Sequence, residues 1–226
     1  MKSLYLCSGV TGALALACAL GLAGCGGSPA ELSLGGSVSG LTKPGLVLQN
    51  NGGPDLAVPS GSTSFYFPDL IASDEKYNVT IKTQPTGATC TVSSGSGRSA
   101  YNVSSVVVSC VTFSFDVGGT INGLPGPNGP SGAPCAFPNQ TGKDQCLVLN
   151  NGSVTKAFPY GTTTFNMTTP ISDSSGNVAL YYGRVTDDLP YGITIFQQPT
   201  GKTCSITNGV GVMAGAAVTN LKVDCI

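Results

Sequence analysis

The sequence contains no histidine and no tryptophan among its 226 residues, and only 9% of the residues are charged. Histidine is the commonest general base and the commonest metal ligand in proteins. Its absence therefore excludes imidazole-dependent catalytic triads and histidine-ligated zinc, copper or iron sites. A net charge of −1 provides no basic surface for nucleic acid. The composition favours a protein without a cofactor and without a nucleic-acid partner.

The N-terminus has the features of an export signal. Lys2 precedes an apolar run over residues 10–22, which is shorter than the roughly 20 residues that a bilayer-spanning helix needs. A basic start, a short apolar run and small residues at its end are typical of a cleaved signal peptide. We therefore expect residues 1–24 to be removed and to take no part in the fold.

The end of this run, Leu22-Ala23-Gly24-Cys25, resembles the lipobox of bacterial lipoproteins. The resemblance implies cleavage before Cys25 and a diacylglycerol on its thiol, followed by a linker over residues 25–33. It also implies a lipid-anchored place in the cell envelope, in the outer membrane of a Gram-negative bacterium because Gly26 follows the cysteine. Several acyl chains would anchor the protein firmly in the membrane, because each buried methylene contributes about 0.8 kcal/mol of binding free energy. An ordinary signal peptide cut nearby is the alternative.

Two long segments match each other in order, which indicates an internal duplication. The first contains GLVLQNNG at 45–52, YNVTIKTQPTGATC at 77–90 and VVVSC at 106–110. The second contains CLVLNNG at 146–152, YGITIFQQPTGKTC at 191–204 and LKVDC at 221–225. We expect two domains of one fold, residues 34–115 (repeat 1) and residues 116–226 (repeat 2).

Hydrophobic residues alternate with polar ones throughout both segments. Tyr77, Val79 and Ile81 alternate with polar neighbours, as half-buried strands do. No segment after Cys25 has helical periodicity, and glycine, proline and asparagine separate the short apolar runs. This pattern predicts an all-β fold of two tandem antiparallel β-sandwiches, immunoglobulin-like or prealbumin-like. The sequence does not decide between these two strand orders.

Six cysteines remain after the signal and Cys25 are set aside. An even number in an exported protein predicts disulfides, and each cysteine near the end of a repeat faces the same way as its apolar neighbours. We predict the pairs Cys90–Cys110, Cys135–Cys146 and Cys204–Cys225. The longer loops would stabilise each domain by roughly 3 kcal/mol. Free buried thiols are the alternative, and the CxxC spacing of a metal site is absent.

The motif order GLVLQNNG, YxVTIxxQPTGxxC and a valine-rich strand ending in cysteine resembles a repeat common in secreted and lipid-anchored bacterial proteins. That repeat is often tandem and has no known function. The resemblance covers residues 34–110 well and residues 116–225 with two interruptions. It implies an extracellular β-sandwich architecture, and it implies no catalytic residue.

Two insertions distinguish repeat 2 from repeat 1. The first, near residues 125–146, includes the collagen-like run GLPGPNGPSGAPC at 123–135. It is too short for a triple helix, so we expect an exposed, partly polyproline loop tied at its base by Cys135–Cys146. The second insertion lies near residues 172–190. Its alternation at Val178, Leu180 and Tyr182 predicts an extra hairpin.

Few side chains suggest a ligand site. Tyr160, Tyr181 and Tyr182 are candidates for stacking on a sugar ring, and the alternative is ordinary core and surface positions. Asp187 and Asp188, together with Asp173, could coordinate calcium. They lack the spacing of a calcium loop, and solvated acids are the alternative.

These features predict a non-enzymatic cell-envelope lipoprotein, attached to the membrane through Cys25, that is structural or binds a protein or glycan partner. A periplasm-facing accessory subunit of an envelope complex is one alternative. A hydrolase that works without histidine is another, although no nucleophile motif such as G-x-S-x-G is present.

Overall fold

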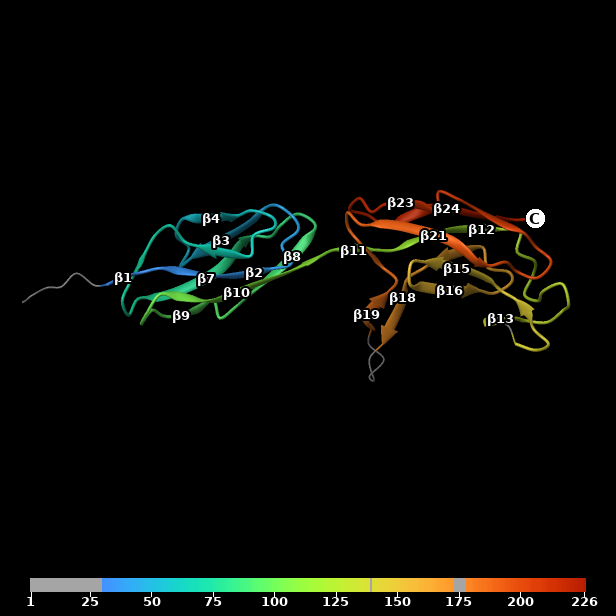
Figure 1. Cartoon of the computed structure of the whole chain (residues 1–226), viewed down its shortest axis with the longest axis horizontal. Coiled ribbons are helices and arrows are strands. Elements are labelled where there is room, and N and C mark those ends of the chain that lie inside the picture. The colour runs from blue at the N-terminus through green and yellow to red at the C-terminus, as the bar shows by residue number, and fades with distance from the viewer. Residues whose placement is uncertain (1–29, 139, 173–177) are drawn as a thin grey trace, which may run out of the picture.

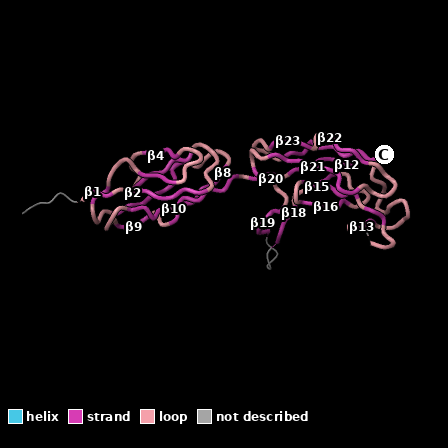
Figure 2. Tube along the Cα trace, in the orientation of Figure 1, coloured by secondary structure: helices cyan, strands magenta, loops and turns pink. Residues whose placement is uncertain are grey.

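The computed structural model describes residues 30–138, 140–172 and 178–226. Cys25 and the predicted signal peptide lie outside these ranges. Every regular element in the described ranges is a β-strand, as Figure 2 shows, so the predicted all-β sandwich class is confirmed. No helix in this part of the chain is long and apolar enough to cross a membrane. The two repeats lie end to end in Figure 1.

Repeat 1 consists of two four-stranded sheets and a short strand pair. The first sheet has the order β5 (Ser64–Tyr66), β2 (Leu34–Ser39), β10 (Val103–Thr112) and β8 (Ala88–Ser93). The second has the order β4 (Asp55–Val58), β3 (Leu46–Asn50), β7 (Lys76–Thr83) and β9 (Ser96–Arg98). β1 (Glu31–Leu32) pairs with β6 (Ile71–Ala72).

Repeat 2 has the same two sheets and two additional strand pairs. One sheet has the order β17 (Thr164–Asn166), β12 (Val117–Asn122), β24 (Val218–Cys225) and β22 (Cys204–Thr207). The other has the order β16 (Val154–Phe158), β15 (Leu147–Asn151), β21 (Pro190–Gln197) and β23 (Val210–Val212). β11 (Ser114–Phe115), just before β12, pairs with β20 (Val185–Thr186) as β1 pairs with β6 in repeat 1. The additional pairs are β13 (Cys135–Ala136) with β14 (Asp144–Gln145), and β18 (Thr169–Ser172) with β19 (Val178–Tyr182).

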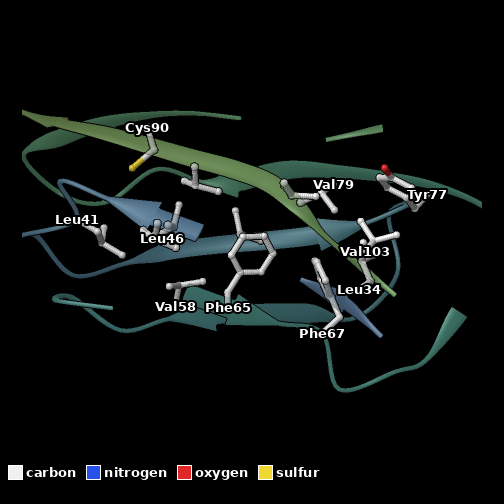
Figure 3. Close-up of a cluster of buried hydrophobic side chains, with 14 of the residues drawn as sticks. Leu34, Leu41, Leu46, Val58, Phe65, Phe67, Tyr77, Val79, Cys90 and Val103 are labelled. Atoms are coloured by element: carbon white, nitrogen blue, oxygen red, sulfur yellow. The ribbon is translucent and has the colours of Figure 1, made fainter. Parts of the chain in front are cut away.

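Each repeat encloses its own hydrophobic core between its two sheets. In repeat 1, Leu34 and Val106 from one sheet pack with Leu46 and Leu48 from the other, and all are buried. Figure 3 shows this core, with Phe65 at its centre. In repeat 2 the corresponding cluster includes Leu147, Leu149, Leu221 and Val223. The alternating residues of the sequence are the residues that face inward, because side chains on a strand alternate between its two faces.

One feature of each sandwich differs from the predicted antiparallel arrangement. The first strand of each repeat pairs in parallel with the last, β2 with β10 and β12 with β24. In the immunoglobulin constant type the first strand instead shares a sheet with the second, fourth and fifth strands. The parallel pair arises because the two ends of each repeat meet at the centre of one sheet.

Glycine allows the central strands to approach closely. A Cβ on Gly36 of β2 would overlap the carbonyl oxygen of Val106, and a Cβ on Gly119 of β12 would overlap that of Leu221. The Gly-Gly pair that opens each repeat is therefore a requirement of the parallel pairing, and a larger residue at the second glycine would separate the strands.

Three disulfides are present, at the three predicted pairs. Cys90 and Cys110 lie opposite each other on β8 and β10, and Cys204 and Cys225 lie opposite each other on β22 and β24. All four are buried.

A glutamine side chain holds the first cysteine of each pair in place. The amide of Gln198 accepts a hydrogen bond from the Cys204 N–H at 2.7 Å and donates one to the Cys204 carbonyl at 3.0 Å. Gln84 makes the same two bonds with Cys90 in repeat 1. The glutamine of the repeated Gln-Pro-Thr-Gly sequence thus satisfies backbone groups that a neighbouring strand would otherwise satisfy.

We predict that Gln198→Met lowers the free energy of unfolding of repeat 2 by about 1–3 kcal/mol. The substitution preserves side-chain size but leaves a part-buried N–H and carbonyl unpaired. Urea denaturation of the oxidised protein measures the change. The matched control is Gln140→Met at an exposed position, where a change within about 0.5 kcal/mol is expected. Equal stability of the two variants would contradict the assigned role of Gln198.

Candidate functional site

The first insertion packs against the outer face of repeat 2. Val148 of β15 is fully buried although it lies outside the core cluster, whereas its counterpart in repeat 1, Val47, is only half-buried. The insertion lies beside this face, because Pro130 approaches the turn at Gly201. We call the surface formed by residues 125–138, residues 140–146 and Phe196 the insertion face.

The insertion has an ordered interior. Asp144 is buried and accepts hydrogen bonds from the Ser131 hydroxyl at 2.6 Å and the Ser131 N–H at 3.2 Å. The Cys135–Cys146 disulfide closes its base. The expectation of an exposed loop holds for most of its residues, but these contacts order the loop. The Gln145 N–H donates to the Thr200 hydroxyl at 2.7 Å and the Gln197 amide donates to the Cys146 carbonyl at 3.2 Å, which fixes the base of the loop to the sandwich.

Tyr160 is not a ligand-stacking residue, which corrects one of the sequence predictions. It is 5% exposed, and its hydroxyl donates a hydrogen bond to the Gln145 carbonyl at 3.0 Å. Burial raises the pKa of Tyr160. Its counterpart in repeat 1 is the exposed Ser60, so a large ring is present only where the insertion covers it. That difference between the repeats was the signal available in the sequence.

An exposed aromatic pair lies on the insertion face. The rings of Phe137 and Phe196 meet edge to face with centroids 6.1 Å apart, and Phe196 remains 61% exposed. The counterpart of Phe196 in repeat 1 is Lys82, which pairs with Asp55 at 2.8 Å. Repeat 2 thus presents apolar rings where repeat 1 presents an ion pair. Neither phenylalanine stands out in the sequence as a candidate binding residue.

The other two tyrosine candidates, Tyr181 and Tyr182, lie on β19. Their side chains fall outside the described part of the structure, and their role in ligand contact stays a prediction. β18 and β19 form the predicted hairpin. In Figure 1 this hairpin emerges near the junction of the repeats, and β13 lies at the far end of repeat 2.

A lysine of repeat 1 binds two aspartates of repeat 2. The Lys43 ammonium donates to Asp187 and to Asp188 at 2.6 Å each. Asp187 also accepts the Gly215 N–H at 2.6 Å. These aspartates were candidates for a calcium site together with Asp173, which lies outside the described residues. The structure instead joins both to Lys43, and among the described residues no cluster of three metal-ligating side chains is found.

Backbone hydrogen bonds strengthen the same junction. The Phe113 N–H donates to the Gly87 carbonyl, and the Asp187 N–H donates to the Phe113 carbonyl, both at 2.9 Å. β11 then pairs with β20 immediately after Phe113. The segment between the repeats is therefore bonded on both sides, which limits rotation of one repeat against the other.

Beside the junction lies a cavity of about 520 Å³, lined by residues 111–116 with Arg184 and Ala217. Asp116 accepts hydrogen bonds from Arg184 and Thr168 at 2.9 Å and from Asn166 at 3.3 Å. Burial raises the pKa of Asp116, but these hydrogen bonds outweigh it, so the pKa lies below its ordinary value. A lowered pKa makes this carboxylate a weaker base than an ordinary aspartate, and its three hydrogen bonds give it a structural role.

The chain matches no protein-family model and no curated protein. Similar solved structures include the major pilin protein T3.2 of Streptococcus pyogenes, at 10% identity and a TM-score of 0.26 over 87% of this chain and 96% of that one. Two B repeat units of the collagen-binding protein of Staphylococcus aureus match at 16% identity and a TM-score of 0.22, over 87% of this chain and 49% of that one. The T-13 pilin of S. pyogenes matches at 9% identity and a TM-score of 0.23, over 86% and 95%. TM-scores this low carry no argument about function.

We predict that the junction is pH-dependent. The hydrogen bond to Asp187 raises the pKa of Lys43, and the hydrogen bond from Lys43 lowers that of Asp187. Because the pKa of Asp187 is lowered, the stability that the bridge contributes is fully present above the ordinary aspartate pKa of about 4. Because the pKa of Lys43 is raised, that stability is fully present below the ordinary lysine pKa of about 10. The bridge is lost as the pH falls through the Asp187 value or rises through the Lys43 value. Small-angle scattering across this pH range should show that the two repeats keep a fixed relative orientation between those limits.

The matched variants are Lys43→Met and Lys82→Met. Lys43→Met should broaden the distribution of overall dimensions at neutral pH. Lys82→Met removes an exposed ion pair within repeat 1 and should leave the distribution unchanged. A scattering profile of Lys43→Met identical to that of the unaltered protein would show that the bridge does not hold the junction.

Proposed function

We propose that the protein is a non-enzymatic cell-envelope lipoprotein that binds a protein or glycan partner through the insertion face of repeat 2. The observation that carries this proposal is the exposed aromatic pair formed by Phe196 of β21 and Phe137 of the insertion, which a disulfide and buried hydrogen bonds order. Binding residues are commonly found on loops held by a rigid scaffold. Aromatic side chains are the residue class that most often dominates binding energy.

The predicted lipid anchor and the position of the insertion support the insertion face as the binding surface. The lipobox at Leu22–Cys25 supports an acyl anchor at Cys25 in the outer membrane of a Gram-negative bacterium. Repeat 1 would then be nearest the membrane, and repeat 2 would lie beyond it, held by Lys43. The insertion lies at the end of repeat 2 away from the junction (Figure 1), which is the end that would meet a partner.

The chemistry of the described residues also favours binding over catalysis. Acidic side chains in the described ranges, including Asp116, Asp144 and Asp187, are engaged by donors within the fold. A hydrolase would need a nucleophile beside a base and a cavity for the substrate. The insertion face is instead ordered and exposed, and its apolar surface suits the binding of a partner.

The proposal predicts that exchanging the insertion for its repeat 1 counterpart abolishes attachment. The variant replaces residues 125–146 with the sequence Thr42–Gly45 and carries Tyr160→Ser, because Ser60 is the repeat 1 residue. Repeat 1 folds with these residues, so the sandwich should remain folded. Cells that display the variant should lose binding to immobilised protein and glycan arrays.

A point variant makes the same test without removing the loop. Phe196→Lys introduces the repeat 1 residue and should weaken attachment by about tenfold or more. Leu189→Lys, at an exposed apolar position of the same repeat, is the control and should have little effect. Unchanged attachment of both the exchange variant and Phe196→Lys would remove the insertion face from the account, and robust hydrolytic turnover would overturn the non-enzymatic assignment.

A further inference from the structure

Repeat 2 has an open groove on the outer face of its β17–β12–β24–β22 sheet. The groove encloses about 350 Å³, and Gly118 and Gly119 of β12 form part of its lining. The surrounding polar side chains come from three adjacent strands and the segment before β12: Asp116, Thr120, Thr164, Asn166 and Thr219. In the register of the sheet, Gly118 lies opposite Asn166 of β17.

The equivalent position of repeat 1 is covered by an aromatic ring. Gly35 lies opposite Tyr66 of β5. A Cβ built on Gly35 would meet the Tyr66 ring, with its Cε1 atom at 2.9 Å. An aromatic side chain across from a strand glycine covers the bare backbone and adds buried apolar area. Repeat 1 therefore fills its own glycine site with a phenol ring.

Repeat 2 lacks this ring. Asn166 replaces the tyrosine, and its side chain is held by the Thr168 N–H at 2.8 Å and by Asp116 at 3.3 Å. The three atoms nearest to a Cβ built on Gly118 all belong to the backbone of Phe165 and Asn166. The short side chain leaves the space above the glycine open.

We propose that this groove, the glycine groove, binds a tyrosine side chain presented by a protein partner. The same sheet position in the same chain already accommodates a phenol ring, which fixes the shape of the occupant. The threonine hydroxyls and the Asn166 amide at the rim supply donors and acceptors for the phenol hydroxyl and the partner backbone. β17 is an edge strand of its sheet, so an extended partner segment can pair beside the groove, although the Lys156 ammonium already donates a hydrogen bond to the Asn166 carbonyl at 2.8 Å.

A glycan fits the groove less well. Sugar rings stack on exposed aromatic faces, and the one aromatic residue in the lining, Phe165, is 6% exposed and belongs to the core. The glycine groove thus differs in chemistry from the insertion face, where exposed rings are present. The proposal rests on the proposed function only in that both assign a binding role to repeat 2.

The test uses the ¹⁵N-labelled full-length protein and N-acetyltyrosinamide as the probe. Titration should shift the amide signals of Gly118 and Gly119, with a Kd of about 1 mM for a single ring. Asn166→Tyr places the ring within the chain and should weaken probe binding by at least about tenfold. Asn166→Ser leaves the groove open and should bind the probe as the unaltered protein does.

The reciprocal variant keeps the test independent of whether Asn166→Tyr folds. Tyr66→Asn opens the equivalent site of repeat 1 and should add a second set of shifts at Gly35 and Gly36. Absence of shifts at Gly118 and Gly119, or equal binding by Asn166→Tyr, would overturn the proposal. Stronger binding of an N-acetylglucosamine oligomer than of N-acetyltyrosinamide would overturn it in favour of a glycan. Self-association that Asn166→Tyr abolishes would assign the groove to a second copy instead.

The outcome is separable from that of the insertion-face experiments. Asn166→Tyr leaves residues 125–146 and Phe196 unchanged. Failure of the probe to bind, with attachment through the insertion face intact, would remove only the glycine groove. Probe binding with attachment unaffected by the insertion exchange would keep the groove and remove the insertion face.

Discussion

The architecture depends on how closely the first strand of each repeat approaches its neighbours. β2 and β12 lie at the centre of a sheet, each between an antiparallel edge strand and the parallel last strand of its repeat. Gly36 and Gly119 permit that approach because any Cβ would overlap a carbonyl oxygen of the last strand. Closing the repeat in this way places its last cysteine opposite the first cysteine of the pair, to which the disulfide joins it, and the glutamine side chain holds that first cysteine in place. The adjacent outward glycine, Gly35 or Gly118, leaves a bare patch on the surface as a consequence.

The duplication provides an internal comparison for function. The inward positions of the two repeats keep similar apolar residues, since both must fill the same space between two sheets. Differences gather on the outer faces, where Ser60, Tyr66 and Lys82 of repeat 1 correspond to Tyr160, Asn166 and Phe196 of repeat 2. Tyr160 supports the insertion, Phe196 exposes an aromatic ring, and Asn166 opens the glycine groove. This distribution is expected if repeat 1 is a spacer and repeat 2 carries the binding surfaces.

Much of the fold follows from local patterns in the sequence. The alternation at Tyr77, Val79 and Ile81 marked a strand with one buried face, and the matched positions of Cys90 and Cys204 indicated their partners. The parallel pairing of β2 with β10 could not be inferred, because it depends on where two distant ends of a repeat meet. The contact of Lys43 with Asp187 and Asp188 could not be inferred for the same reason. The burial of Tyr160 could not be inferred, because it depends on a loop that the repeat pattern does not describe.

We propose that repeat 2 faces partners at the cell surface, at the end of a lipid-anchored chain whose junction Lys43 holds. Protease digestion of intact cells, with permeabilised cells and a Cys25→Ser variant as controls, tests it most directly. We expect repeat 2 to be cleaved on intact cells, and Cys25→Ser to remove the protein from the cell surface. Cleavage only after permeabilisation would instead place the protein in the periplasm and refute this arrangement.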